Sequence, residues 1–173
     1  MQEPYPSWLY PVKMGATTIW ERWDGIKTDG SFQTPGMNSF NHYAYGAVGD
    51  WMYRVVAGIE IGQPGYKQIR IQPIPDKRLS FAKATYESVY GPVVSGWEVK
   101  DDKVTLNVTI PANTRAVVFL KGTDILKVTS NGAPVNNGTY KTFRNEAGNA
   151  IIEVGSGQYN FTYPLPQKGE TNQ

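Results

Sequence analysis

The residues best suited to chemistry lie within one stretch of the chain, residues 14–36. There, Trp20 and Trp23 bracket Glu21, and Asp24 follows directly. Aromatic faces beside carboxylates are typical of a sugar-binding cleft, because the rings stack on a sugar while the carboxylates handle its hydroxyls and protons. The same spacing also fits two core tryptophans with a solvated acidic rim, so both interpretations stay open at this point.

The carboxylates of this stretch do not make an obvious catalytic pair. Inverting hydrolysis of a glycoside needs two carboxyl groups roughly 6.5–9.5 Å apart, one protonating the leaving oxygen and one deprotonating water. Glu21 and Asp24 are three residues apart, so in a helix they would share one face rather than straddle a substrate. Asp24 and Asp29 each precede a glycine, and we expect them to order loop turns.

One strong helical pattern follows, over residues 38–59, and a shorter helix can begin after Ser7. Apolar residues recur every three or four positions along one face of the longer pattern: Phe40, Tyr43, Ala44, Ala47, Trp51, Val55 and Ile59. A second apolar stripe lies beside the first, so the pattern predicts a helix that is covered on several sides, with Trp51 and Tyr53 in a core. His42 lies in its first turn and, taken alone, favours a boundary residue.

From about Tyr66 onward the pattern changes to β-structure. Apolar and polar residues alternate in short runs separated by turn residues: 69–74, 82–90, 93–100, 104–110, 116–120, 126–129, 150–154 and 159–163. Seven or eight such strands predict an antiparallel β-sandwich over residues 66–166, followed by a disordered tail, 167–173. Residues 1–65 cannot form a domain alone, so we expect them to end a larger helical domain and to expose apolar surface.

Composition excludes several classes of function. The formal net charge is +2 and the seventeen Lys and Arg residues are scattered, so neither nucleic acid nor a membrane is an expected partner. With no cysteine and one histidine, the sequence predicts no metal site, and nothing in it indicates a cofactor. The N-terminus lacks the pattern of a signal peptide, and the compartment stays open between the cytoplasm and the periplasm or exterior of a bacterium.

Two blocks of the chain resemble a known family. ATTIWERWDG (16–25) and SFNHYAYGAVGDW (39–51) closely resemble the end of the catalytic domain of bacterial α-L-rhamnosidases, which are inverting glycoside hydrolases with a six-hairpin α/α barrel. The β segment, with VTLNVTIPANTRAVVFL (104–120), resembles the sandwich domain that follows this barrel. The resemblance implies a mainly β chain: an antiparallel β-sandwich preceded by the last helices of an incomplete six-hairpin α/α barrel, here residues 1–65.

The resemblance also implies roles for individual residues. Glu21 matches the general base that activates water, Trp20 and Trp23 would shape the sugar pocket, and His42 matches a histidine that hydrogen-bonds a sugar hydroxyl. The substrate would be a glycoside carrying a terminal α-L-rhamnose. The family's general acid lies in a preceding part of the barrel, so the partner of this chain would be that upstream portion, and the chain alone is expected to be inactive.

Two alternatives compete with the interpretation as part of a rhamnosidase. The sandwich can be a non-catalytic structural or carbohydrate-binding module with an inert helical stub. In either case the exposed stub can associate with a second copy of the chain. A different α/α-barrel glycosidase is a further alternative, which the long matching blocks around Glu21 and His42 disfavour.

Overall fold

The computed structural model describes residues 4–166, and the tail expected to be disordered, residues 167–173, lies outside them. The chain divides into two compact units, residues 1–50 and residues 51–173. Among the described residues, no helix has both the length and the apolar character needed to cross a membrane.

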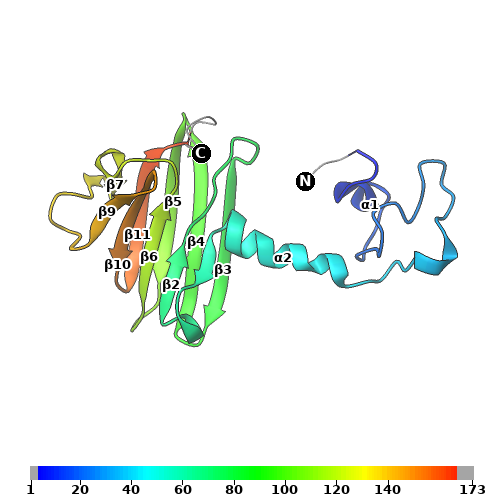
Figure 1. Ribbon diagram of the computed structural model, residues 1–173, viewed down its shortest axis with the longest axis horizontal. Helices are drawn as coiled ribbons and strands as arrows, with labels where there is room; N and C mark the ends of the chain where they lie inside the picture. Colours follow the sequence, from blue (N-terminus) through cyan, green and yellow to red (C-terminus); the bar gives the residue numbers. More distant parts are fainter. Residues whose placement is uncertain (1–3, 167–173) are drawn as a thin grey trace. The chain divides into compact units, whose positions relative to one another are not determined.

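The second unit is a sandwich of two β-sheets (Figure 1). The first sheet has five strands, in spatial order β1 (Ile59–Ile61), β2 (Gln68–Ile71), β6 (Arg115–Leu120), β10 (Asn149–Val154) and β9 (Phe143–Glu146). The second has six, in the order β3 (Phe81–Ser88), β4 (Gly91–Lys100), β5 (Lys103–Ile110), β11 (Gly157–Pro164), β7 (Thr129–Ser130) and β8 (Ala133–Pro134). The predicted sandwich is therefore confirmed. One pair, β2 with β6, runs parallel, and the other pairs are antiparallel.

The core of the sandwich follows from the alternation of apolar residues along the strands. In β5, Val104, Leu106, Val108 and Ile110 are buried while the residues between them are not. Burying each such side chain contributes about 1.5–3 kcal/mol, which is the main force that closes the two sheets on each other. Trp97, Phe161 and Tyr163 are among the largest fully buried side chains of this core: their volume fills the space between the sheets.

The structure corrects the strand prediction at several places. The first half of the run at 126–129 belongs to a 3₁₀ turn, η5 (Ile125–Lys127), because the Asp124 carboxylate accepts a hydrogen bond from the Leu126 N–H at 2.8 Å and curls the backbone. The edge strand β9, with the sequence FRNE, was not predicted, since it is mostly exposed and carries no apolar alternation.

The helix expected over residues 38–59 is much shorter. It consists of a 3₁₀ turn η2 (Ala44–Ala47), an α-helical turn α2 (Val48–Trp51) and a π-helical turn η3 (Met52–Val56). No residue of it is buried; Trp51 and Tyr53, which were expected in the core, are 48% and 44% exposed. The prediction of their burial was wrong, whereas the expected exposure of apolar surface is confirmed.

The helix ends because the chain turns at Gly58 into strand β1. Gly58 has φ +77°, and a Cβ there would lie 2.0 Å from the backbone nitrogen of Pro73, so only glycine fits. Two carbonyls at the end of the helix accept hydrogen bonds from side chains of strand β4. Trp97 Nε1 donates to the Val56 carbonyl at 2.7 Å, and Ser95 Oγ donates to the Ala57 carbonyl at 2.6 Å.

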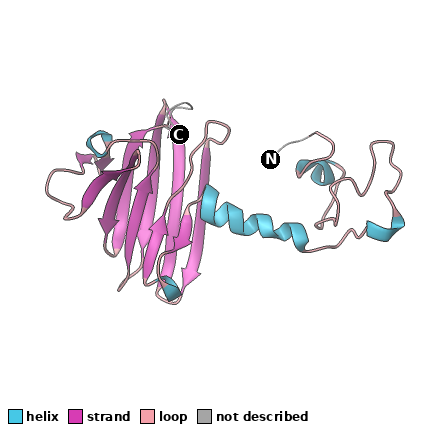
Figure 2. Ribbon diagram, viewed as in Figure 1, coloured by secondary structure: helices cyan, strands magenta, loops and turns pink. Residues whose placement is uncertain are grey.

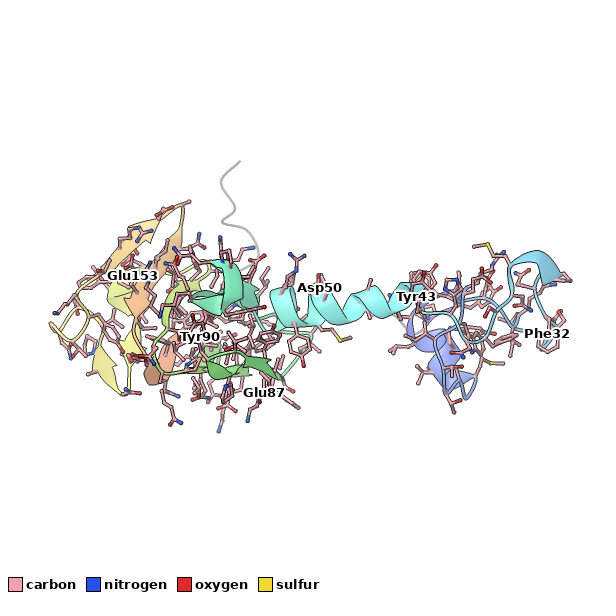
Figure 3. The ribbon with its side chains drawn as sticks, turned by 90° about the horizontal axis from the view of Figure 1, so that it is seen from below. Phe32, Tyr43, Asp50, Glu87, Tyr90 and Glu153 are labelled. Carbon is pink, nitrogen blue, oxygen red and sulfur yellow. The ribbon has the colours of Figure 1, made fainter. Side chains whose placement is uncertain are left out.

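The first unit is mostly loop (Figure 2). The expected short helix is present as α1 (Leu9–Lys13), and a 3₁₀ turn, η1 (Pro35–Met37), lies further along. Tyr10 links α1 to the loop that follows it, because the Tyr10 hydroxyl donates a hydrogen bond to the Ile26 carbonyl at 3.0 Å. Phe32 and Tyr43 are strongly exposed (Figure 3), so much of the apolar surface of this unit is not covered by the described residues.

Candidate active site

Two segments of the first unit, residues 18–21 and 39–42, are joined through their backbones. The Glu21 N–H donates to the Ser39 carbonyl at 2.8 Å, and the His42 N–H donates to the Ile19 carbonyl at 2.7 Å. The Thr18 hydroxyl adds a third bond, to the Phe40 carbonyl. The structure therefore brings the segments that carry Glu21 and His42 together, although the two residues are 21 positions apart in the sequence.

The side chain of Glu21 is held by the same pairing. Its Oε2 accepts a hydrogen bond from the Ser39 N–H at 2.9 Å, so the backbone of Ser39 both accepts from and donates to this residue. Its other oxygen, Oε1, makes no hydrogen bond to the described residues, and the side chain is half-buried. A carboxylate fixed through one oxygen and open at the other can accept a proton from a water molecule.

A backbone hydrogen bond orients the ring of His42. Its Nδ1 accepts a hydrogen bond from the Ala44 N–H at 3.2 Å, which leaves the proton on Nε2. The ring stacks against Tyr43, with centroids 5.4 Å apart and an interplanar angle of 3°. Nε2 is then a donor that can hydrogen-bond the oxygen of a hydroxyl group.

The two tryptophans have different surroundings. Trp20 is only 6% exposed and meets Phe40 edge to face, with centroids 5.0 Å apart. Trp23 stacks on Tyr45 at 5.2 Å and also contacts Trp8 at 5.8 Å. Both line a hollow of about 240 Å³, together with Trp8, Tyr45 and residues of the segments 11–12 and 16–19.

Glu21 and His42 do not line this hollow. The sequence-predicted residues thus fall into two groups: the two tryptophans that line the hollow, and Glu21 with His42, whose segments are held together by the 18–21 and 39–42 backbones. The two groups adjoin: Trp20 directly precedes Glu21 and packs against Phe40. Ile19, whose carbonyl accepts from the His42 N–H, also lines the hollow. A complete sugar site would need further walls.

The remaining acids of this unit's loop are structural, as expected. Asp24 receives a forked hydrogen bond from Arg22, at 2.9 Å and 3.1 Å, and another from Gln33 at 2.9 Å. The Arg22 guanidinium, helped by Gln33, holds the pKa of Asp24 below its ordinary value. Hydrogen bonds from the hydroxyl and backbone of Ser31 likewise lower the pKa of Asp29.

These contacts predict an acid-sensitive first unit. A carboxyl with a lowered pKa stabilises the fold at pH values above its ordinary pKa, and this contribution is lost as the pH falls through the lowered pKa. We expect Asp24→Asn to destabilise the unit by about 1 kcal/mol at pH 7 and to flatten the loss of near-UV circular dichroism below about pH 4. Asp50→Asn, outside this network, is the control; an unchanged acid transition in Asp24→Asn would contradict the assignment.

Several residues that build the site carry weak sequence signals. The sequence did not single out Ser39 as a site residue, yet its backbone N–H orients Glu21. Nor did it single out Tyr45 and Trp8, which flank Trp23. The alternation of aromatic and polar residues in SFNHYAY was the available signal. Among residues 4–166, no group of three or more histidine and acidic side chains is arranged to hold a metal ion.

Comparison with known families agrees with these features. Residues 1–56 match the six-hairpin glycosidase domain of bacterial α-L-rhamnosidases, and residues 58–133 match the C-terminal domain of the same enzymes. The chain belongs to the bacterial α-L-rhamnosidase family. Both parts of the fold are thereby accounted for: a piece of the rhamnosidase barrel domain followed by the rhamnosidase C-terminal sandwich.

Individual relatives support the same assignment. The chain is 46% identical over 162 residues to an α-L-rhamnosidase of Streptomyces avermitilis and 44% identical over 161 residues to one of Formosa agariphila. These alignments cover 93% and 92% of this chain, but only 15% and 17% of the two relatives. The chain therefore spans a small part of the length of the α-L-rhamnosidases that it matches.

Solved structures show the same similarity in three dimensions. The S. avermitilis α-L-rhamnosidase, complexed with L-rhamnose, superposes with a TM-score of 0.81 over 93% of this chain and 15% of that one. The α-L-rhamnosidase of Dictyoglumus thermophilum, 32% identical, superposes with a TM-score of 0.78 over 94% of this chain and 18% of that one. The fold described above is thus the α-L-rhamnosidase fold for the part that the chain spans.

Proposed function

We propose that this chain is the C-terminal part of an enzyme that removes terminal α-L-rhamnose from glycosides by inverting hydrolysis, and that Glu21 is its general base. The observation that carries the proposal is the hydrogen bond from the Ser39 N–H to Glu21 Oε2, with Oε1 left open. In an inverting mechanism, such a carboxylate deprotonates the water that attacks the anomeric carbon on the face opposite the leaving group.

The other three site residues would bind the sugar. His42 donates from Nε2 to a hydroxyl, and the exposed part of Trp23 offers an apolar face to the ring. Trp20 is nearly buried, so its role is to pack beneath the segment that carries Glu21 and to hold that segment in place. No cofactor or metal is needed, because proton transfer between two carboxyl groups and water completes the reaction.

The general acid would come from outside this chain. A general acid must be protonated at the working pH, and the lowered pKa values of Asp24 and Asp29 make both unsuited to that role. We therefore infer that the acid lies on an upstream portion of the barrel, which is the partner of this chain.

The surface of the first unit supports such a partner. Met14, Ile19 and Met37 are exposed in addition to the aromatic residues already described. An upstream barrel portion would cover these apolar groups; a second copy of the chain, associating through the helical stub, is the alternative cover.

The domain division that accompanies this proposal has a barrel end at residues 1–65, a sandwich at residues 66–166 and a tail at residues 167–173. The helical segment 44–56 and strand β1 lie within the proposed barrel end. The alternative function is a sandwich that acts as a structural or carbohydrate-binding module without catalysis, and a hollow on its six-stranded sheet is the observation in its favour.

An assay of the isolated 173-residue chain tests the proposal. We expect no hydrolysis of an aryl α-L-rhamnoside, because a base without its acid and without pocket walls gives little stabilisation of the transition state. The positive control is a chimera in which this chain replaces the matching segment of the S. avermitilis enzyme. Turnover by the isolated chain that Glu21→Gln abolishes would show that the acid lies within these residues, contrary to the proposal.

A further inference from the structure

A second hollow lies on the outward face of the six-stranded sheet, far from Glu21 in the sequence. It measures about 670 Å³ and crosses strands β3, β4, β5 and β11. The strand register aligns Lys83, Gly96, Asn107 and Asn160 in one row across these strands. Gly96 has no side chain of its own, and the stem of Lys83 lies over it, with the Lys83 Cγ 3.0 Å from where a Cβ of residue 96 would be.

The hollow is lined by groups that both donate and accept hydrogen bonds. Asn160 Nδ2 donates to Asn107 Oδ1 at 2.8 Å, which fixes the two amides with their remaining donors and acceptors free for another partner. Thr109 and Gln158, which also line the hollow, belong to the neighbouring row of the sheet. Sugar hydroxyls likewise donate and accept at one oxygen, so a surface of amides and hydroxyls suits them.

The charge of the hollow argues against an anionic ligand. Lys83 and Glu98 are its only two ionisable lining residues with a charge at neutral pH, and they are of opposite sign. A phosphate-bearing or nucleic-acid ligand would instead call for a cluster of basic residues. The balance therefore favours a neutral ligand.

One aromatic side chain stands at the edge of the hollow. Phe81, at the start of β3, is 68% exposed and makes no ring contact with another described aromatic residue. An exposed phenylalanine costs solubility, and its face offers what the apolar face of a sugar ring requires. Phe81 thus provides the stacking element, and the amide row provides the polar one.

We propose that this face of the sandwich binds a neutral oligosaccharide, with Phe81 stacked on one sugar ring and Asn107 and Gln158 hydrogen-bonded to hydroxyls. Binding here is separate from hydrolysis, since none of these residues lies in the first unit. It would hold a polysaccharide near the enzyme that trims it. The choice of a rhamnose-containing oligosaccharide as the probe rests on the proposed function; the site itself does not.

A nuclear magnetic resonance titration of the full chain tests the site. Amide signals are followed as rhamnan oligosaccharides, which are uncharged chains of rhamnose, are added up to their solubility limit. We expect shifts concentrated in β3, β4, β5 and β11, and about tenfold weaker binding for Phe81→Ala and for the double variant Asn107→Ala/Gln158→Ala. Lys103→Ala, on the same sheet but outside the hollow, is the control and should bind as the unchanged chain does.

The outcomes separate this site from the proposed active site. Shifts only in residues 18–45 would overturn the sheet site and leave Glu21 unaffected, whereas shifts only in the sheet would support it whatever the fate of the Glu21 proposal. If the amide signals of the sheet shift neither with the rhamnan nor with an uncharged glucan, the hollow does not bind neutral oligosaccharides. Equal binding of an anionic oligogalacturonide would contradict the argument from charge.

Discussion

Replacing Glu21 with glutamine should lower kcat by about 10²–10⁴-fold, with little change in KM, in the chimera that joins this chain to the upstream part of the S. avermitilis α-L-rhamnosidase. Glutamine keeps the shape of the side chain and can still accept the hydrogen bond from Ser39, but it cannot take a proton from water. The loss is therefore expected in the chemical step. Steady-state kinetics on an aryl α-L-rhamnoside measures it.

The matched control is another acid of the same unit. Asp29→Asn removes a carboxylate from an exposed turn, where it binds only Ser31 among the described residues, and should leave kcat unchanged. His42→Ala is expected to act mainly through KM, because it would remove the hydrogen bond that we propose His42 makes to the bound sugar. Equal losses in Glu21→Gln and Asp29→Asn would mean that folding, not base catalysis, has been disturbed.

Replacing Trp97 with alanine should have the largest effect on stability, about 3–5 kcal/mol lost from the free energy of unfolding. Trp97 is one of the largest fully buried side chains of the sandwich, and its indole N–H donates to the Val56 carbonyl. The substitution thus opens a cavity between the sheets and leaves a carbonyl at the helix end without its donor. Urea unfolding followed by far-UV circular dichroism measures the loss.

Two further variants separate the contribution of the buried volume of Trp97 from that of its hydrogen bond. Trp97→Phe keeps most of the buried volume but not the hydrogen bond, and should cost about 1–3 kcal/mol. Val89→Ala, in the exposed turn between β3 and β4, should stay within about 0.5 kcal/mol of the unchanged chain. A Trp97→Ala variant as stable as Val89→Ala would show that the sheets repack without this side chain.

The sandwich could be predicted because its strands carry a period-two pattern that the core itself imposes. Val104 to Ile110 alternate perfectly between buried apolar and more exposed residues, and the predicted strand matches β5 to within one residue. Strand β9 has no such pattern, since an edge strand held by backbone hydrogen bonds to β10 needs little apolar surface. The parallel pairing of β2 with β6 depends on the path of the chain between them, which no local pattern records.

The helix was predicted too long because its expected extent followed the apolar spacing. The spacing from Phe40 to Ile59 is helical, but Phe40 packs against Trp20 in a loop and Ile59 pairs with Ile71 in the sheet. Apolar residues at helical spacing seek burial in either state, so the pattern could not place the ends. Gly58 was the local signal for the C-terminal end, and its steric reason is a contact with Pro73 that the sequence does not show.

The candidate site was only partly accessible from the sequence. Residue types pointed to Glu21, and the family resemblance added a role for His42. Their proximity arises from backbone hydrogen bonds between residues 19–21 and 39–42, which link segments separated by a loop and have no sequence signature. The hydrogen bond from the Ser39 N–H to Glu21 could not be predicted either, because a backbone N–H is available at almost every residue.

The most direct test of Glu21 as the base is the configuration of an azide product. In the Glu21→Ala chimera, azide can enter the space of the missing carboxylate and attack the anomeric carbon from the face where water would attack. We expect the rate on an activated aryl α-L-rhamnoside to recover with azide, and nuclear magnetic resonance to identify β-L-rhamnosyl azide. Rhamnose release by Glu21→Ala at the unsubstituted rate, or an azide adduct of α configuration, would contradict the assignment.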